Sequence, residues 1–244
     1  MSRPPRLRAD AAVFAVALAL AFGMKAFYAS ASADALGWIL GPTAALVSLL
    51  SGQHFEAEPG IGYLSRELML VIAPACAGIN YLVIAFCTLV LGFAPRSGRP
   101  ARRWGWLFAA GALAYAATLL VNALRIALAI ALREGTLPAW LSASQAHRLE
   151  GIAVYLGSLW LLVWLIARGF AQRTDAWRVA LLPLLLYLAV TLLVPLANGA
   201  WARPEFWAHA RVVLVASLGL AAVVWMGLSA ARRPGAPRCQ VQER

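Results

Sequence analysis

The sequence is poor in charged residues, which make up 13% of its 244 positions, against roughly 25% in ordinary soluble domains. Hydrophobic residues make up 62%, and the mean hydropathy is +0.75. A chain of this composition needs lipid rather than water as its main solvent. Apolar stretches and short connectors use up nearly the whole length. We therefore expect a single transmembrane domain over residues 1–244, without a separate soluble domain.

Cysteine and histidine are scarce, which excludes several kinds of site. The three cysteines, Cys76, Cys87 and Cys239, contain no CxxC pair and give no disulfide framework. The three histidines show no HExxH or other metal-ligand spacing. We therefore expect no metal and no cofactor, and a metalloprotease is disfavoured.

Acidic residues are also few, at 10 against 21 basic ones, so that the net charge is +11. In a soluble protein such a charge points to nucleic acid, but this chain has no basic face and no recognition motif. Its basic residues stand in short clusters between apolar runs, as the positive-inside rule describes. The charge therefore predicts membrane topology, and we expect no nucleic-acid binding.

Several apolar stretches approach the roughly 20 residues that a spanning helix needs. They cover 11–29, 76–93, 104–125, 151–168, 178–199 and 211–231. A further stretch, 36–50, is short and contains glycine and proline. We therefore predict an all-α integral membrane protein, a polytopic bundle with about six spanning helices. The stretch 36–50 is expected to be interfacial or re-entrant and buried against protein.

The distribution of basic residues predicts the orientation of the chain in the membrane. With the N-terminus inside, the inner connectors and the tail carry about twice as many basic residues as the outer connectors. Both termini are therefore expected in the cytoplasm. The single crossing 76–93 brings the chain from the outer side to the inner side by Arg96, which leaves no crossing for 36–50.

The first motif that stands out from the apolar sequence is Pro74-Ala75-Cys76-Ala77-Gly78. Proline is tolerated in the first turn of a helix but breaks its interior, so a spanning helix should start near Cys76 on the outer side. The helix dipole and exposed amides there favour a thiolate and can bind an oxyanion. Gly78 would let another backbone approach closely. The alternative is that Cys76 is a small buried hydrophobic residue.

The second position is Asn122 with Arg125, three residues apart and so on one helix face. An arginine in an apolar run usually faces protein or water and has a functional partner. The alternative is an arginine that snorkels to the interface.

The third position is His147 with Glu150. Ser142 and Gln145 fit a capping box, which places His147 near the N-terminus of a helix, again on the outer side. The helix dipole there disfavours the imidazolium ion and keeps the ring available as a base. Glu150, three residues further on, could orient the ring. The alternative is a histidine at the end of a loop, exposed to water.

Cys76, Arg125 and His147 come from three different crossings, yet the expected topology brings all three to the outer face. The sequence therefore contains a candidate Cys/His/Arg site that faces outward. His54 and His209 also lie on the expected outer side, so an enzyme that uses either of them as the base stays open.

These motifs resemble the exosortase/archaeosortase family. Its members are multi-pass membrane proteins with a cysteine motif, an Asn-x-x-Arg motif and a histidine followed by glycine, in this order. The match is Ala75 to Gly78, then Asn122 to Ile126, then His147 with Gly151, and it covers about 60–170. The family often has Cys-Ser-Gly where this chain has Cys-Ala-Gly, which indicates a divergent, small subfamily.

The resemblance implies a membrane cysteine transpeptidase or protease at the outer face of a bacterial inner membrane. Cys76 would attack the scissile carbonyl and form a thioester. His147 would exchange the proton with the thiol and the leaving amine. Arg125 would stabilise the oxyanion or align the thiolate.

The implied partners are exported proteins with a C-terminal sorting signal of the PEP-CTERM kind, together with membrane lipids. A nucleophile on a surface carbohydrate or lipid would release the product, and water in its place would make the enzyme a hydrolase. Asn122, Glu150 and Gly78 are expected to support the catalytic residues.

Two other readings stay open. A non-enzymatic transporter or assembly partner would use Arg125 and Lys25 as contacts for a substrate or ion, although Lys25 lies near enough to the end of its helix to snorkel. The other is a different intramembrane protease, with a serine dyad that uses Ser144 or Ser158. No motif in the sequence supports it.

Overall fold

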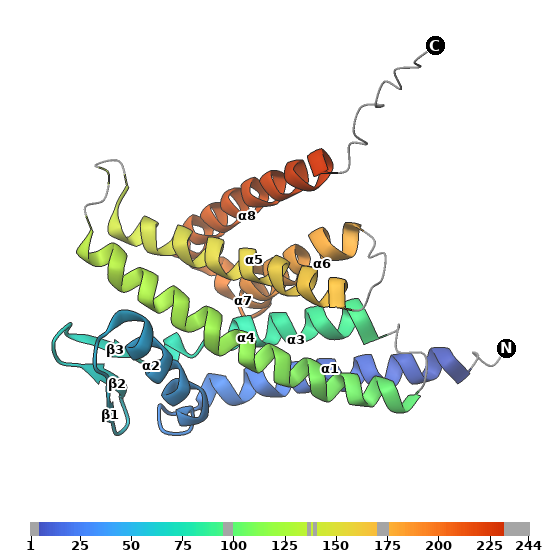
Figure 1. The fold of residues 1–244 in the computed structure, drawn as a ribbon, viewed down its shortest axis with the longest axis horizontal. Coiled ribbons are helices and arrows are strands. Elements are labelled where there is room, and N and C mark those ends of the chain that lie inside the picture. The colour runs from blue at the N-terminus through green and yellow to red at the C-terminus, as the bar shows by residue number, and fades with distance from the viewer. Residues whose placement is uncertain (1–4, 95–99, 136–137, 139–140, 170–175, 232–244) are drawn as a thin grey trace, which may run out of the picture.

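The computed structural model describes residues 5–94, 100–135, 138, 141–169 and 176–231, and helices dominate it (Figure 1). They are α1 (Pro5–Ser30), α2 (Gly37–Ser51), α3 (Ile79–Phe93), α4 (Pro100–Glu134), α5 (Ala143–Gly169), α6 (Ala176–Leu188), α7 (Val194–Ala197) and α8 (Pro204–Ala231). Short 3-10 turns lie at η1 (Pro74–Cys76) and η4 (Ala200–Ala202), and a π turn, η3, lies at Ala189–Leu193. The expected all-helical polytopic fold is confirmed.

Within the described residues, five helical segments are long and apolar enough to cross a membrane. They are Ala11–Ser30, Pro74–Phe93, Ala101–Arg133, Ala143–Gly169 and Pro204–Gly227. The sixth expected crossing, 178–199, corresponds to α6, η3 and α7, which follow one another without a gap from Ala176 to Ala197. Pro195 cannot donate to the carbonyl one turn earlier, and the chain widens into the π turn just before it.

Helix α3 is the centre of the bundle. Its segment Pro74–Phe93 is 72% buried inside the protein, against 11% for Ala11–Ser30 of α1. It packs against α1, α4, α5 and α6. A helix that is apolar all round suits this place, because protein covers it on every side.

A small antiparallel sheet precedes α3 and was not expected from the sequence. Its strands are β1 (Glu56–Glu58), β2 (Gly62–Ser65) and β3 (Leu70–Ile72), in the order β1-β2-β3. Gly62 has a φ of +131°, and a side chain there would collide with the carbonyl of Ile72. Strand β3 leads directly into η1, so the sheet fixes how the chain enters the bundle at Cys76.

Helix α2 corresponds to the short segment expected at 36–50. Its 15 residues are too few to span a bilayer. One face, with Ile39, Leu40 and Val47, is buried, and the helix packs on α4 and β2. The opposite face exposes Leu49 and Leu50. Burial against protein is thus confirmed for one face, and the interfacial location stays a prediction.

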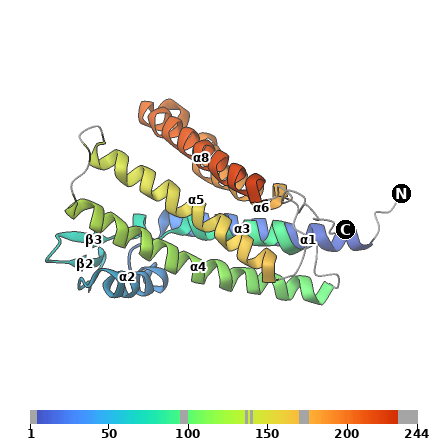
Figure 2. The same ribbon diagram turned by 45° about the horizontal axis from the view of Figure 1, so that its top comes forward.

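The helix ends gather at two opposite ends of the bundle (Figures 1 and 2). The end that we call the sheet end holds α2, the three strands, the last turns of α4 and the first turns of α5. The end that we call the termini end holds the first turns of α1 and α4 and the last turns of α3, α5 and α8. Glu56 and Glu58 of β1 lie at the sheet end.

The arginines of the expected inner side that the structure describes include Arg102, Arg103 and Arg168. They lie in the first turn of α4 and the last turn of α5, at the termini end (Figure 1). The expected inner clusters around 96–99, 173 and 232–244 lie outside the described residues.

Ala110 of α4 has no exposed surface, whereas its neighbour Ala109 is exposed. A leucine at position 110 has to enter a packed interface, which typically costs about 1–3 kcal/mol. We expect Ala110→Leu to lower the thermal unfolding temperature of the detergent-solubilised protein, and Ala109→Leu to leave it nearly unchanged. Equal unfolding temperatures for the two variants would contradict the described packing of α4.

Candidate active site

Cys76 ends the turn η1 between β3 and α3. Pro74 suits the first position of this turn, because its φ is fixed and it has no N–H to satisfy. The N–H of Cys76 donates to the carbonyl of Ala73 at 2.7 Å. Helix α3 begins only at Ile79, so Cys76 lies just before the helix whose start was expected near it. The residue is partly exposed.

Gly78 occupies the N-cap position of α3, and no side chain caps the helix there. Its φ is +71°, a conformation that costs other residues about 1–2 kcal/mol. A Cβ at this position would lie 3.0 Å from Cγ of Asn122 and 3.2 Å from Cγ2 of Thr118. The close approach expected at Gly78 is therefore made by side chains of α4, and not by another backbone.

Asn122 joins α4 to the turn that carries Cys76. Its side chain is fully buried. Nδ2 donates to the carbonyl oxygen of Cys76 at 2.5 Å, and Oδ1 accepts from the hydroxyl of Tyr155 at 2.8 Å. Asn122 thus holds the backbone of Cys76 in place.

Tyr155 of α5 is the residue that sequence reasoning missed. Its hydroxyl donates to Asn122 and accepts from Nη1 of Arg125 at 3.3 Å. Its ring lies against the ring of Tyr81, with centroids 5.1 Å apart. A signal was present, because Tyr155 follows His147 by two turns on the same helix face.

Arg125 reaches across α5 to His147. Its Nη2 lies 3.4 Å from Nε2 of His147, and the guanidinium lies 5.3 Å from the centroid of the Tyr155 ring. A Cβ at Gly151 would stand 3.9 Å from Cδ of Arg125, so the arginine passes directly over this glycine. Because Gly151 has no side chain, the side chain of Arg125 can pass over it and reach His147.

His147 lies between Arg125 and the carboxyl group of Glu150. Arginine only donates, so its contact requires an unprotonated Nε2 and leaves the ring proton on Nδ1. Nδ1 lies 3.6 Å from Oε2 of Glu150, which is close but too long for a direct hydrogen bond. The His147 side chain is 54% exposed and that of Glu150 only 7%. Neither carboxylate oxygen of Glu150 has a hydrogen-bond partner among the described residues.

Helix α1 holds the same turn from the other side. The hydroxyl of Tyr28 donates to the carbonyl of Pro74 at 3.2 Å. Lys25 donates to Oδ1 of Asn80, in the first turn of α3, at 2.7 Å. Lys25 therefore has a protein partner, in addition to lying near the end of its helix.

The other candidate residues lie elsewhere in the described structure. His54 lies 3.7 Å from Glu56, and both side chains are mostly exposed. The hydroxyl of Ser144 contacts that of Ser142, and the hydroxyl of Ser158 donates to the carbonyl of Tyr155. His209 belongs to α8. Across the described ranges, no group of three or more His, Cys, Asp or Glu residues is placed to hold a metal ion.

Gly78 and Gly199 allow a matched test of the close approach to Asn122. Both have positive φ, but a Cβ at Gly199 meets nothing within 4 Å. Alanine at either position is destabilised by about 1–2 kcal/mol because of the left-handed backbone conformation. Only alanine at position 78 would also crowd Asn122. We expect Gly78→Ala to lose more stability than Gly199→Ala in thermal unfolding. Equal losses would mean that Asn122 does not lie against Gly78.

No protein-family model, no curated protein and no solved structure matches this chain.

Proposed function

We propose that this chain is an exosortase-like membrane cysteine transpeptidase or protease, which processes the C-terminal sorting signals of exported proteins. One observation carries the proposal: the three motifs of the resemblance contact one another. Asn122 binds the backbone of Cys76, and Arg125, three residues later, reaches His147 over Gly151.

In the proposed reaction the thiolate of Cys76 attacks the scissile carbonyl. A carbon–sulfur bond forms, the carbon–nitrogen bond breaks and a thioester results. Nε2 of His147 takes the thiol proton and delivers it to the leaving amine. Glu150 then faces the Nδ1–H of the imidazolium and stabilises its charge. The guanidinium of Arg125 stabilises the oxyanion, together with N–H groups of α3 that no side chain caps.

The second half of the reaction transfers the acyl group. A nucleophile on a surface carbohydrate or lipid attacks the thioester and frees the thiol; water in that place gives hydrolysis. The substrate carries its own membrane helix, which holds its cleavage site at the height of the turn η1. Such tethering raises the effective concentration without a deep binding pocket.

We place the site at the outer face of a bacterial inner membrane, with both termini in the cytoplasm. The support is the distribution of basic residues along the sequence, about twice as many of which fall in the inner connectors and the tail as in the outer connectors. Arg102, Arg103 and Arg168 lie at the termini end, whereas the sheet end holds Glu56 and Glu58 together with Arg66 and Arg133. An excess of arginine on one side is what the positive-inside rule requires of the cytoplasmic side.

The direct test is processing of a co-expressed protein that ends in a recognition segment, a membrane helix and a basic tail. We expect Cys76→Ala to abolish processing, because no thioester can form. Cys87→Ala is the matched control, since Cys87 is buried within α3, and should process as the wild type does. Processing by Cys76→Ala at the wild-type level would end the proposal, and solute uptake into vesicles that this variant retains would favour a transporter.

The choice of base is tested in the same assay by three substitutions, His147→Ala, His54→Ala and His209→Ala. Of these three histidines, His147 is the one whose contact with Arg125 is seen among the described residues. We expect loss of processing in His147→Ala alone. Full activity in this variant would move the role of base to His54 or His209.

A further inference from the structure

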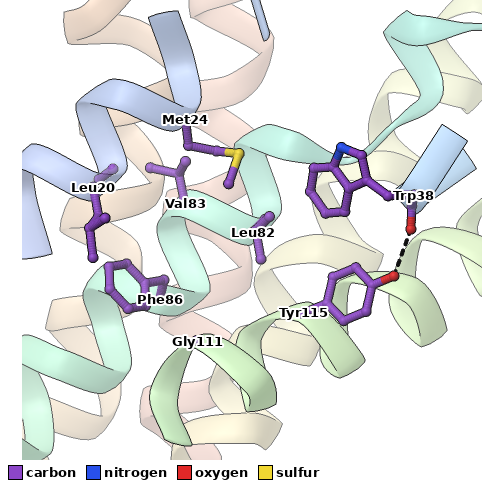
Figure 3. A pocket seen from close by; sticks show the side chains of 9 residues that line it. Leu20, Met24, Trp38, Leu82, Val83, Phe86, Gly111 and Tyr115 are labelled. Carbon is purple, nitrogen blue, oxygen red and sulfur yellow. Dashed lines mark hydrogen bonds between the residues drawn. The ribbon is translucent and has the colours of Figure 1, made fainter. Parts of the chain in front are cut away.

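A cavity of about 450 Å³ lies beneath the site, between α1, α3 and α4 (Figure 3). Its lining residues are Leu20, Ala21, Met24, Trp38, Leu82, Val83, Phe86, Gly111 and Tyr115. Figure 3 shows Met24 and Leu20 facing Val83 and Phe86 across it, with Trp38 and Tyr115 closing one side.

The lining offers hydrocarbon and aromatic surface. Its one side-chain hydroxyl, that of Tyr115, already donates to the carbonyl of Trp38 at 2.7 Å. A cavity lined almost entirely by apolar surface takes apolar ligands in preference to ordered water. Leu20 both lines the cavity and is exposed, so the cavity communicates with the lipid-facing surface of α1.

The end of the cavity nearer the sheet end carries a polar pair. Lys25 follows Ala21 by one turn on α1, and Asn80 precedes Val83 by three residues on α3, so both stand over lining residues. Nζ of Lys25 donates to Oδ1 of Asn80 at 2.7 Å. An ammonium group has three donors, so two stay available to an anion, as does the amide of the exposed Asn80.

We propose that this cavity binds an anionic phospholipid, with one acyl chain between α1 and α3 and the phosphate at Lys25 and Asn80. The volume lies within the range of small-ligand sites, whereas a transmembrane helix, about 10 Å across, does not fit. The ammonium group of Lys25 at the end of an apolar cavity suits a ligand that has an anionic headgroup and an apolar tail. This inference does not depend on the proposed enzymatic activity.

The bound lipid has a structural consequence for the site. Only 11% of the spanning segment of α1 is buried in the protein, yet this helix supplies Tyr28, which holds the carbonyl of Pro74. A chain that fills the space between α1 and α3 therefore steadies the turn that carries Cys76.

The test uses the full-length protein in detergent micelles with phosphatidylglycerol that carries a photoreactive group in one acyl chain. Cross-linked peptides are identified by mass spectrometry, and unlabelled phosphatidylglycerol or phosphatidylcholine competes. We expect cross-links in the peptides of Met24 and Phe86. Phosphatidylglycerol should compete about fivefold better than phosphatidylcholine, the gain expected from one lysine near an anionic lipid.

The cavity has a matched pair of glycines on α4. A Cβ at Gly111 or at Gly105 meets nothing within 4 Å, but only Gly111 lines the cavity. Gly111→Leu should fill the space and remove the cross-links, and Gly105→Leu should keep them. Cross-links in Gly111→Leu at the wild-type level would overturn the proposed site for the chain.

The headgroup is tested separately, with variants that leave the cavity open. Lys25→Gln should abolish the preference for phosphatidylglycerol, and Lys25→Arg should retain it because the charge stays in place. Equal competition by the two lipids in the wild type would overturn the choice of an anionic ligand. Protection of the lining by a co-expressed substrate helix but by neither lipid would assign the cavity to that helix and overturn the lipid proposal.

Discussion

The hydrogen bond from Nδ2 of Asn122 to the carbonyl of Cys76 is the contact on which the rest of the site depends. The turn η1 breaks the chain where it enters an apolar bundle, and the carbonyl of Pro74 accepts from the N–H of Ala77 within this turn. An unsatisfied carbonyl in such surroundings costs several kcal/mol. Tyr28 from α1 adds a second donor to the carbonyl of Pro74, and Asn122 from α4 donates to the carbonyl of Cys76. Two helices thereby hold the cysteine, and Gly78 gives Asn122 room to reach it.

The remaining contacts follow from the hydrogen bonds that the side chain of Asn122 itself requires. Its Oδ1 needs a donor, which Tyr155 supplies, and the same hydroxyl accepts from Arg125. Arg125 brings a positive charge into the bundle, and His147 lies between its guanidinium and the buried carboxyl group of Glu150. Arg125 and Glu150 thus flank the two ring nitrogens of His147.

Hydropathy predicted most of the fold, because a spanning helix needs a long apolar run and α1, α3, α4, α5 and α8 provide one. The spacing of Asn122 and Arg125 likewise predicted a shared helix face. The sheet was missed because strands of three or four residues give no clear alternation. Tyr155 was missed because a tyrosine in an apolar run is usually a packing residue of the core. Its hydroxyl gains a role only in the folded chain, where Asn122 lies opposite and accepts its hydrogen bond. The contribution of α1 could not be predicted either, since Tyr28 is distant in sequence from the turn that it holds.

The central claim is that the turn η1 presents a reactive thiol to the outer face. Labelling of intact cells with a membrane-impermeant maleimide tests it most directly, with the wild type and Cys76→Ala compared. Cys87 is buried, so the account predicts labelling of the wild type and its loss in the variant. Labelling that persists in Cys76→Ala would contradict the account, as would a wild-type protein that is labelled only after the cells are permeabilised.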